Sequence, residues 1–167
     1  MSVSVSNIYL IPSLTSSMIW IILALGISGT ASCPIPGQTE LHGFIREAAR
    51  LSDYPYPKAV EYGIRLVEQD GQWFTLFYNG AEAAIYWPGM IVLNCSKLET
   101  YPQVYQDSVF IHESVHHLQY LNGEMTDTGC RTVQRLETEA YQIQSAYLVA
   151  HGEPAVTGPS VRCSGSK

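Results

Sequence analysis

The sequence predicts a single α+β domain in which one helix precedes an antiparallel β-meander and two longer helices follow it. Two observations support this prediction. Short apolar runs separated by turn dipeptides fill residues 63–94, which is typical of strands, whereas the segments on either side repeat their apolar residues every three to four positions, which is typical of helices. The whole chain has 167 residues, so we expect one domain.

Residues 1–31 have the pattern of a signal peptide, which leaves residues 32–167 as the predicted domain. The apolar stretch Met18–Ile27 is too short to span a bilayer, which takes about 20 residues. Small residues follow it, and cleavage after Ala31 fits them. No Lys or Arg precedes the apolar stretch, so an uncleaved anchor or an ordinary buried helix stays open. We expect export to the periplasm or the extracellular space, with no stable membrane insertion after cleavage.

The four cysteines fit an exported chain. An even count predicts two disulfides, in any of three pairings. A lipid anchor on Cys33 is disfavoured, because Thr30 matches such a signal poorly and an odd thiol would remain. No Cys-x-x-Cys spacing exists to suggest a cysteine zinc site. The four residues are Cys33, Cys95, Cys130 and Cys163.

The elements before residue 95 are predicted from period and turn signals. Leu41–Leu51 has the apolar spacing of a helix, and the prolines and tyrosines of Ser52–Lys58 predict a loop. Asp70-Gly71, Asn79-Gly80 and Pro88-Gly89 then predict turns between strands of an antiparallel meander. The four predicted strands are Gly63–Glu68, Trp73–Tyr78, Ala83–Trp87 and Met90–Asn94.

Two helices are predicted in the second half of the chain. After a polar connection over Cys95–Gln106, Asp107 is placed to cap a helix from Ser108 to Leu121, with Gly123 just past its end. A second helix is predicted from about Asp127 to Ala150, and the tail beyond it resembles a loop.

Charge and composition exclude several kinds of partner. The formal net charge is −6, and no run of Lys or Arg occurs, so a nucleic-acid or anionic-membrane surface is not expected. Frequent aromatic residues and only 14% charged residues argue against disorder.

The residues that indicate chemistry are His112, Glu113 and His116, a His-Glu-x-x-His motif inside the first of these two helices. In a helix, His112 and His116 lie one turn apart and about 40° apart in azimuth, so both imidazoles can bind one metal ion. Glu113 lies about 100° from His112, where it can reach a water molecule on the metal without binding the metal itself. Catalytic zinc needs a third protein ligand, and the next helix offers Glu137 and Glu139. These two lie about 200° apart, so only one of them can face the metal.

A helical His-Glu-x-x-His followed by a glutamate on the next helix resembles the gluzincin branch of the zincin zinc metallopeptidases, in particular its small exported members. The resemblance implies a zincin-like fold in which an edge strand, for which Met90–Asn94 is the candidate, runs above the active-site helix and pairs with substrate. It favours Glu137 as third ligand, because Glu137 and Ala140 fit the Glu-x-x-Ala pattern of related families, with Glu139 as the alternative. It implies one Zn²⁺ per chain, Glu113 as general base, and Tyr141 as a candidate second oxyanion donor.

The sequence therefore predicts a zinc-dependent peptidase acting on peptide or protein substrates. Two alternatives remain: an inactive zincin-fold binding module with a structural metal, and a hydrolase of non-protein amides such as cell-wall cross-links.

Two neighbours of the motif have open roles. We expect His117 to be a solvated or hydrogen-bonded neighbour of the site. Gln119 lies on the metal side, where it can either support a ligand or cap a loop.

Overall fold

The computed structural model describes residues 33, 35–57, 64–69, 71–78, 82–127 and 129–158, with the backbone alone for residues 77 and 78. The predicted signal peptide, residues 1–31, lies outside the described residues. None of the helices in the described ranges combines the length and the apolar character that crossing a bilayer requires.

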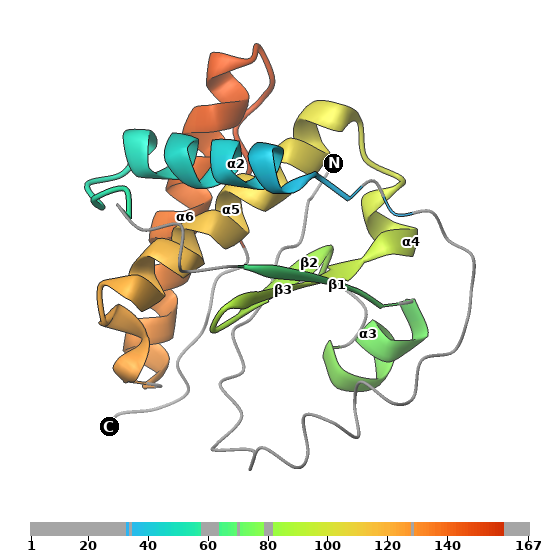
Figure 1. The fold of residues 1–167 in the computed structure, drawn as a ribbon, viewed down its shortest axis with the longest axis horizontal. Helices are drawn as coiled ribbons and strands as arrows, with labels where there is room; N and C mark the ends of the chain where they lie inside the picture. The colour runs from blue at the N-terminus through green and yellow to red at the C-terminus, as the bar shows by residue number, and fades with distance from the viewer. Residues whose placement is uncertain are drawn as a thin grey trace.

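The architecture is α+β, with a small mixed sheet and long packed helices (Figure 1). The elements in chain order are α2 (Gln38–Leu51), β1 (Arg65–Gln69), α3 (Gly71–Tyr78), β2 (Ala84–Trp87), β3 (Met90–Asn94), α4 (Cys95–Leu98), α5 (Gln103–Leu121), the 3-10 helix η1 (Glu124–Thr126) and α6 (Cys130–Ala150).

The sheet differs from the predicted meander. Its order is β1-β3-β2, with β1 parallel to β3 and only β2 antiparallel to β3. The prediction of a strand at Trp73–Tyr78 is wrong, because this segment forms the helix α3. A parallel pair needs a long crossover connection, and α3 lies in the crossover from β1 to β3. The predicted turn at Pro88-Gly89 joins β2 to β3, and the positive φ of 76° at Gly89 suits glycine.

The helices agree with the prediction in type but not at every boundary. The helix α2 contains the whole predicted segment Leu41–Leu51. The helix α5 begins at Gln103, after Pro102, so Asp107 lies inside it and is not its cap. Part of the predicted connection forms α4. The helix α6 begins at Cys130, later than predicted, because Asp127 accepts hydrogen bonds from the Gly129 N–H (2.8 Å) and the Thr132 hydroxyl (2.7 Å) ahead of the first turn.

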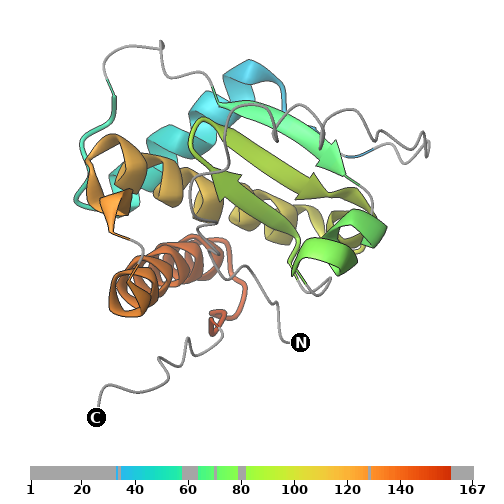
Figure 2. The same cartoon turned by 90° about the horizontal axis from the view of Figure 1, so that it is seen from below.

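The helix α5 lies at the centre of the fold. It packs against α2, α6 and the strand β2, and Figures 1 and 2 show it between the sheet and α6. Apolar side chains on several of its faces are therefore buried, among them Val109, Phe110, Ile111, Val115 and Leu118. The polar side chains on the same turns of α5 are removed from water together with these apolar ones. Burying a polar group is costly unless it has a partner, so the buried histidines and glutamate of α5 need a physical explanation.

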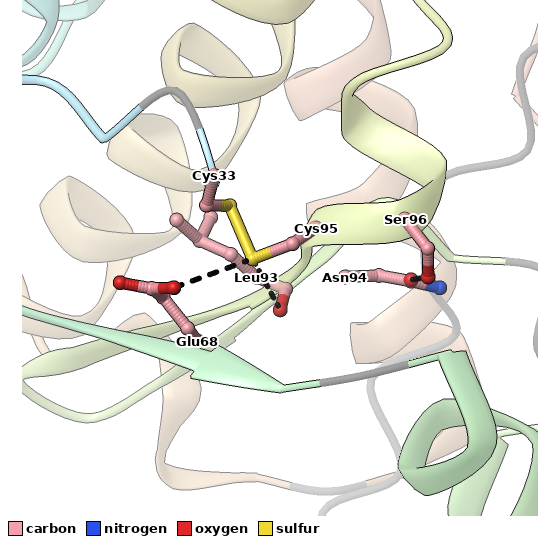
Figure 3. Close-up of a disulfide and its surroundings, with 6 residues drawn as sticks. All are labelled: Cys33, Glu68, Leu93, Asn94, Cys95 and Ser96. Atoms are coloured by element: carbon pink, nitrogen blue, oxygen red, sulfur yellow. Dashed lines mark hydrogen bonds between the residues drawn. A yellow bond between two sulfur atoms is a disulfide. The ribbon is translucent and has the colours of Figure 1, made fainter. Parts of the chain in front are cut away.

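A disulfide joins Cys33, which precedes α2, to Cys95, the first residue of α4 directly after β3 (Figure 3). It links the chain ahead of α2 to the end of the sheet. Figure 3 shows the Glu68 carboxylate near Sγ of Cys95, and the distance between Oε2 and Sγ is 4.0 Å. Of the three pairings that the sequence left open, the structure contains the one with Cys33–Cys95. Cys130 is also disulfide-bonded, and Cys163 lies outside the described residues.

Candidate metal centre

The interior of α5 carries charged and polar side chains that are fully removed from solvent. His112, Glu113 and His116 each have 0% exposed surface, and Glu137 on the facing helix α6 has 2%. Ionisable groups are buried in this way only when they are paired or bind a metal, because an isolated buried charge is costly. The burial therefore indicates that these four side chains are paired with one another or bind a metal ion.

Three donor groups converge between α5 and α6. Nε2 of His112 lies 3.1 Å from Nε2 of His116. The Glu137 carboxylate lies 3.5 Å from each of these nitrogens, through Oε2 and Oε1 respectively. All three donor atoms fall within 4.8 Å of one another. A tetrahedral zinc ion with donors at about 2.0–2.1 Å holds them about 3.3 Å apart, so the observed spacing fits a zinc site.

The two glutamates that the sequence offered have different surroundings. Glu137 faces both histidines. Oε2 of Glu139 instead accepts hydrogen bonds from the Tyr54 hydroxyl at 2.8 Å and from Nε2 of Gln119 at 2.9 Å. The two glutamates point to different sides of α6, as the expected 200° separation requires. Only Glu137 joins the cluster of possible ligands among the described residues.

The electrostatics of the cluster follow from burial and close charges. Burial lowers the pKa of His112. Burial is the largest single effect on His116 and acts to lower its pKa, but Glu137, Glu113 and Gln119 together outweigh it and raise that pKa to about 9. For Glu137, burial acts upward while the two histidines lower the pKa to about 2. Without a cation at pH 7, the Glu137 carboxylate is thus paired with a protonated His116 beside a neutral His112. A cation that displaces the His116 proton would meet one carboxylate and two imidazoles, a donor set suited to Zn²⁺.

Glu113 lies beside the triad without belonging to it. Burial raises the pKa of this carboxyl to about 8, against smaller lowering effects of His116 and of the Tyr86 backbone. Neither of its oxygens has a hydrogen bond of good geometry to the protein. A buried carboxyl without a firm partner is expensive to maintain, so its presence favours a role in proton transfer.

Each histidine of the triad has a glutamine as a neighbour. Nδ1 of His116 lies 2.8 Å from Oε1 of Gln119, and an amide oxygen can only accept a hydrogen bond. In the neutral imidazole the proton therefore sits on Nδ1, and the lone pair of Nε2 faces Nε2 of His112 and the Glu137 carboxylate. Gln144 acts on His112 more weakly. It acts to raise the pKa of His112, as the smallest of the effects on that group, while burial lowers the pKa overall.

The remaining predicted neighbours also lie close to the cluster. The ring of Tyr141 meets the His112 ring edge-on, with centroids 4.7 Å apart. His117 is buried, and its Nδ1 lies 3.0 Å from the Tyr86 hydroxyl, which also accepts a hydrogen bond from the Gly89 N–H. Burial lowers the pKa of His117 to about 4, so this imidazole is neutral at pH 7. His117 is thus a hydrogen-bonded neighbour rather than a solvated one.

Sequence reasoning missed three residues around the site. Tyr86 comes from β2, Tyr54 from the segment after α2, and Gln144 from α6. The helical period from Glu137 could have identified Gln144, because seven residues make about two turns. No local pattern marks Tyr54 or Tyr86, since their approach to α5 and α6 depends on tertiary packing.

The expected position of the edge strand is wrong. Met90–Asn94 forms β3, which lies between β1 and β2 and is therefore the central strand. β2 is at an edge of the described sheet, and it is the strand that packs against α5. The mixed topology causes this difference, because β1 pairs with β3 instead of extending a meander.

No protein-family model matches the sequence, and neither a curated protein nor a solved structure matches it. What the site shows thus comes from its own geometry: a buried triad of His112, His116 and Glu137 on two facing helices that is suited to binding a metal ion.

Proposed function

We propose that this chain is a zinc-dependent hydrolase, and that its substrates are peptide bonds. The observation that carries the proposal is the convergence of His112, His116 and Glu137 within 4.8 Å, with the buried Glu113 next to them. A His-Glu-x-x-His helix with a glutamate on the facing helix has the ligands of a catalytic zinc site and, in addition, a general base. A purely structural site has no use for that base.

The proposed roles follow from what each side chain can do. His112, His116 and Glu137 hold one Zn²⁺, which supplies Lewis-acid activation of water and of the scissile carbonyl. Glu113 accepts the proton of the attacking water and delivers it to the leaving amine nitrogen. Tyr141, whose ring contacts His112, is proposed to donate a hydrogen bond to the oxyanion. Export is part of the proposal, because a disulfide such as Cys33–Cys95 persists in oxidising compartments.

The test is the zinc content of the oxidatively folded protein starting at Ser32. We expect about one zinc per chain, no zinc in His116→Ala, and unchanged zinc in the matched control His42→Ala, which alters a histidine on α2 far along the chain from the triad. A screen of a peptide library for hydrolysis then tests the activity. Well-folded protein without zinc would refute the proposal.

One observation favours a second candidate, a binding module with a structural metal. His112, Glu113 and His116 have no exposed surface at all, whereas catalytic zinc keeps a position open for water and substrate. One zinc per chain with no hydrolysis of peptides or amides, in wild type as in Glu113→Gln, would decide for this candidate.

A further inference from the structure

The hydrogen bonds behind His116 continue past Gln119 to the surface of α6. Nε2 of Gln119 donates to Oε2 of Glu139 at 2.9 Å and to the backbone carbonyl of Leu136 at 3.1 Å. Both of these partners are acceptors only. The NH₂ group of Gln119 must therefore point to them, which leaves its oxygen facing His116.

This arrangement resolves an ambiguity that a glutamine amide ordinarily has. The oxygen and nitrogen of an amide are interchangeable in shape, so a flip by 180° would present NH₂ to the imidazole of His116. A flipped amide would bring its oxygen against the Glu139 carboxylate and the Leu136 carbonyl, three acceptors with no proton among them. It would also favour the tautomer of His116 with its proton on Nε2, the nitrogen that a metal needs unprotonated.

The Glu139 side chain is in turn held by Tyr54, which lies in the segment after α2. Oε2 of Glu139 accepts from the Tyr54 hydroxyl at 2.8 Å, while the same hydroxyl lies 2.9 Å from Oε1 of Glu124. Arg135 pairs with the other oxygen of Glu124 and so compensates one of the two carboxylates. The Glu139 side chain is therefore held in place by contacts that do not involve the metal position.

We propose that Glu139 is a positioning residue: by accepting a hydrogen bond from Gln119, it fixes the amide that keeps the proton of His116 on Nδ1 and leaves Nε2 free to bind zinc. The inference rests on the proposed function, since it concerns the same zinc site. Glu139 thereby has a role other than binding the metal, which was the alternative that the sequence left open for it. Because Glu139 acts through Gln119, removing Glu139 changes the zinc affinity only while Gln119 is present.

The test is a double-mutant cycle read as zinc affinity, measured by competition with a chromophoric chelator on the folded, oxidised chain. We expect Gln119→Leu to weaken zinc binding by about 10–100-fold. Glu139→Leu weakens it by at least about threefold, and the double variant matches Gln119→Leu within about twofold, because the two residues act in series. Glu139→Gln keeps wild-type affinity, since an amide oxygen in the place of Oε2 accepts the same hydrogen bonds. The control Gln142→Leu, on the exposed face of α6, leaves the affinity unchanged.

A second readout separates positioning from a general loss of structure. Nδ1 of His116 is buried and lies 2.8 Å from Oε1 of Gln119, so in the zinc-loaded protein we expect the proton on Nδ1 to exchange slowly with water, as measured by nuclear magnetic resonance. We expect Gln119→Leu and Glu139→Leu to accelerate this exchange and Glu139→Gln to preserve it. Should Glu139→Leu not fold, Glu139→Ala takes its place at this partly exposed position.

The possible outcomes are distinct. Loss of zinc from Glu139→Leu in both the wild-type and the Gln119→Leu background would make Glu139 a ligand and overturn the inference. Affinity within twofold of wild type in Glu139→Leu would overturn it as well, because the Leu136 carbonyl alone would then hold Gln119. Absence of zinc from the wild-type chain would instead refute the proposed function, and the inference with it.

Discussion

The disulfide between Cys33 and Cys95 closes a loop with a sequence separation of 62. Cross-linking a chain restricts the unfolded state by an entropy of about −2.1 − 1.5R ln n cal/mol/K, which for this loop is about −14 cal/mol/K. At 25 °C, this corresponds to about 4 kcal/mol of stability. We therefore expect Cys33→Ala/Cys95→Ala to lose about 4 kcal/mol of its free energy of unfolding, a large share of the roughly 5–15 kcal/mol of a typical domain.

The assay is equilibrium unfolding in urea with a chelator present, so that zinc binding contributes to neither protein. The free energies of wild type and variant are extrapolated to zero urea, and equal slopes would show that the same surface is exposed on unfolding. Cys130 is left unchanged, so its own disulfide persists in both proteins. A loss below about 1.5 kcal/mol would refute the reasoning, because the loop entropy would then not be the source of the stability.

Four further predictions concern the site. Glu113→Gln is expected to keep zinc and to lower hydrolysis by about 10²–10⁴-fold, the usual contribution of a general base; undiminished turnover would contradict this role. Zinc analysis of Glu137→Ala and Glu139→Ala is expected to show loss of the metal only in the former, and the reverse result would exchange their roles. Zinc at 100 times its Kd is expected to raise the free energy of unfolding by about 2.7 kcal/mol, measured in urea against chelator-treated protein. Tyr86→Phe removes the hydrogen bond to buried His117 and is expected to cost about 1–3 kcal/mol in the same assay, whereas an unchanged midpoint would mean that the bond is not formed.

The long helices α2, α5 and α6 were predictable because their amphipathic period is long enough to recognise. The segment Trp73–Tyr78 was not, since six residues with strong β-propensity fit a strand and a helix turn equally well. What decides is the parallel pairing of β1 with β3, a contact between residues about 25 positions apart, such as Arg65 and Met90. Tertiary pairing of this kind overrides local preference, and it also put β3 in the centre of the sheet.

The motif itself predicted which residues of α5 would face one another, because a helix fixes the relation of positions i and i+4. The choice between Glu137 and Glu139 depended on how α6 is rotated against α5, and no local rule contains that angle. For the same reason, the sequence could not decide whether Gln119 supports His116 or caps a loop. Tyr54, which donates a hydrogen bond to Glu139, comes from the segment after α2, and only the packed structure brings these distant parts of the chain together.

The complete burial of His112, His116 and Glu113 also has a kinetic consequence. A cation can reach or leave such a cluster only when the packing of α5 against α6 opens locally. Release of the metal to a chelator in excess would then proceed at the rate of that opening, independent of chelator concentration. Metal uptake would be fastest while the chain is still folding, so the supply of zinc at the moment of folding would determine what fraction of the molecules carries it.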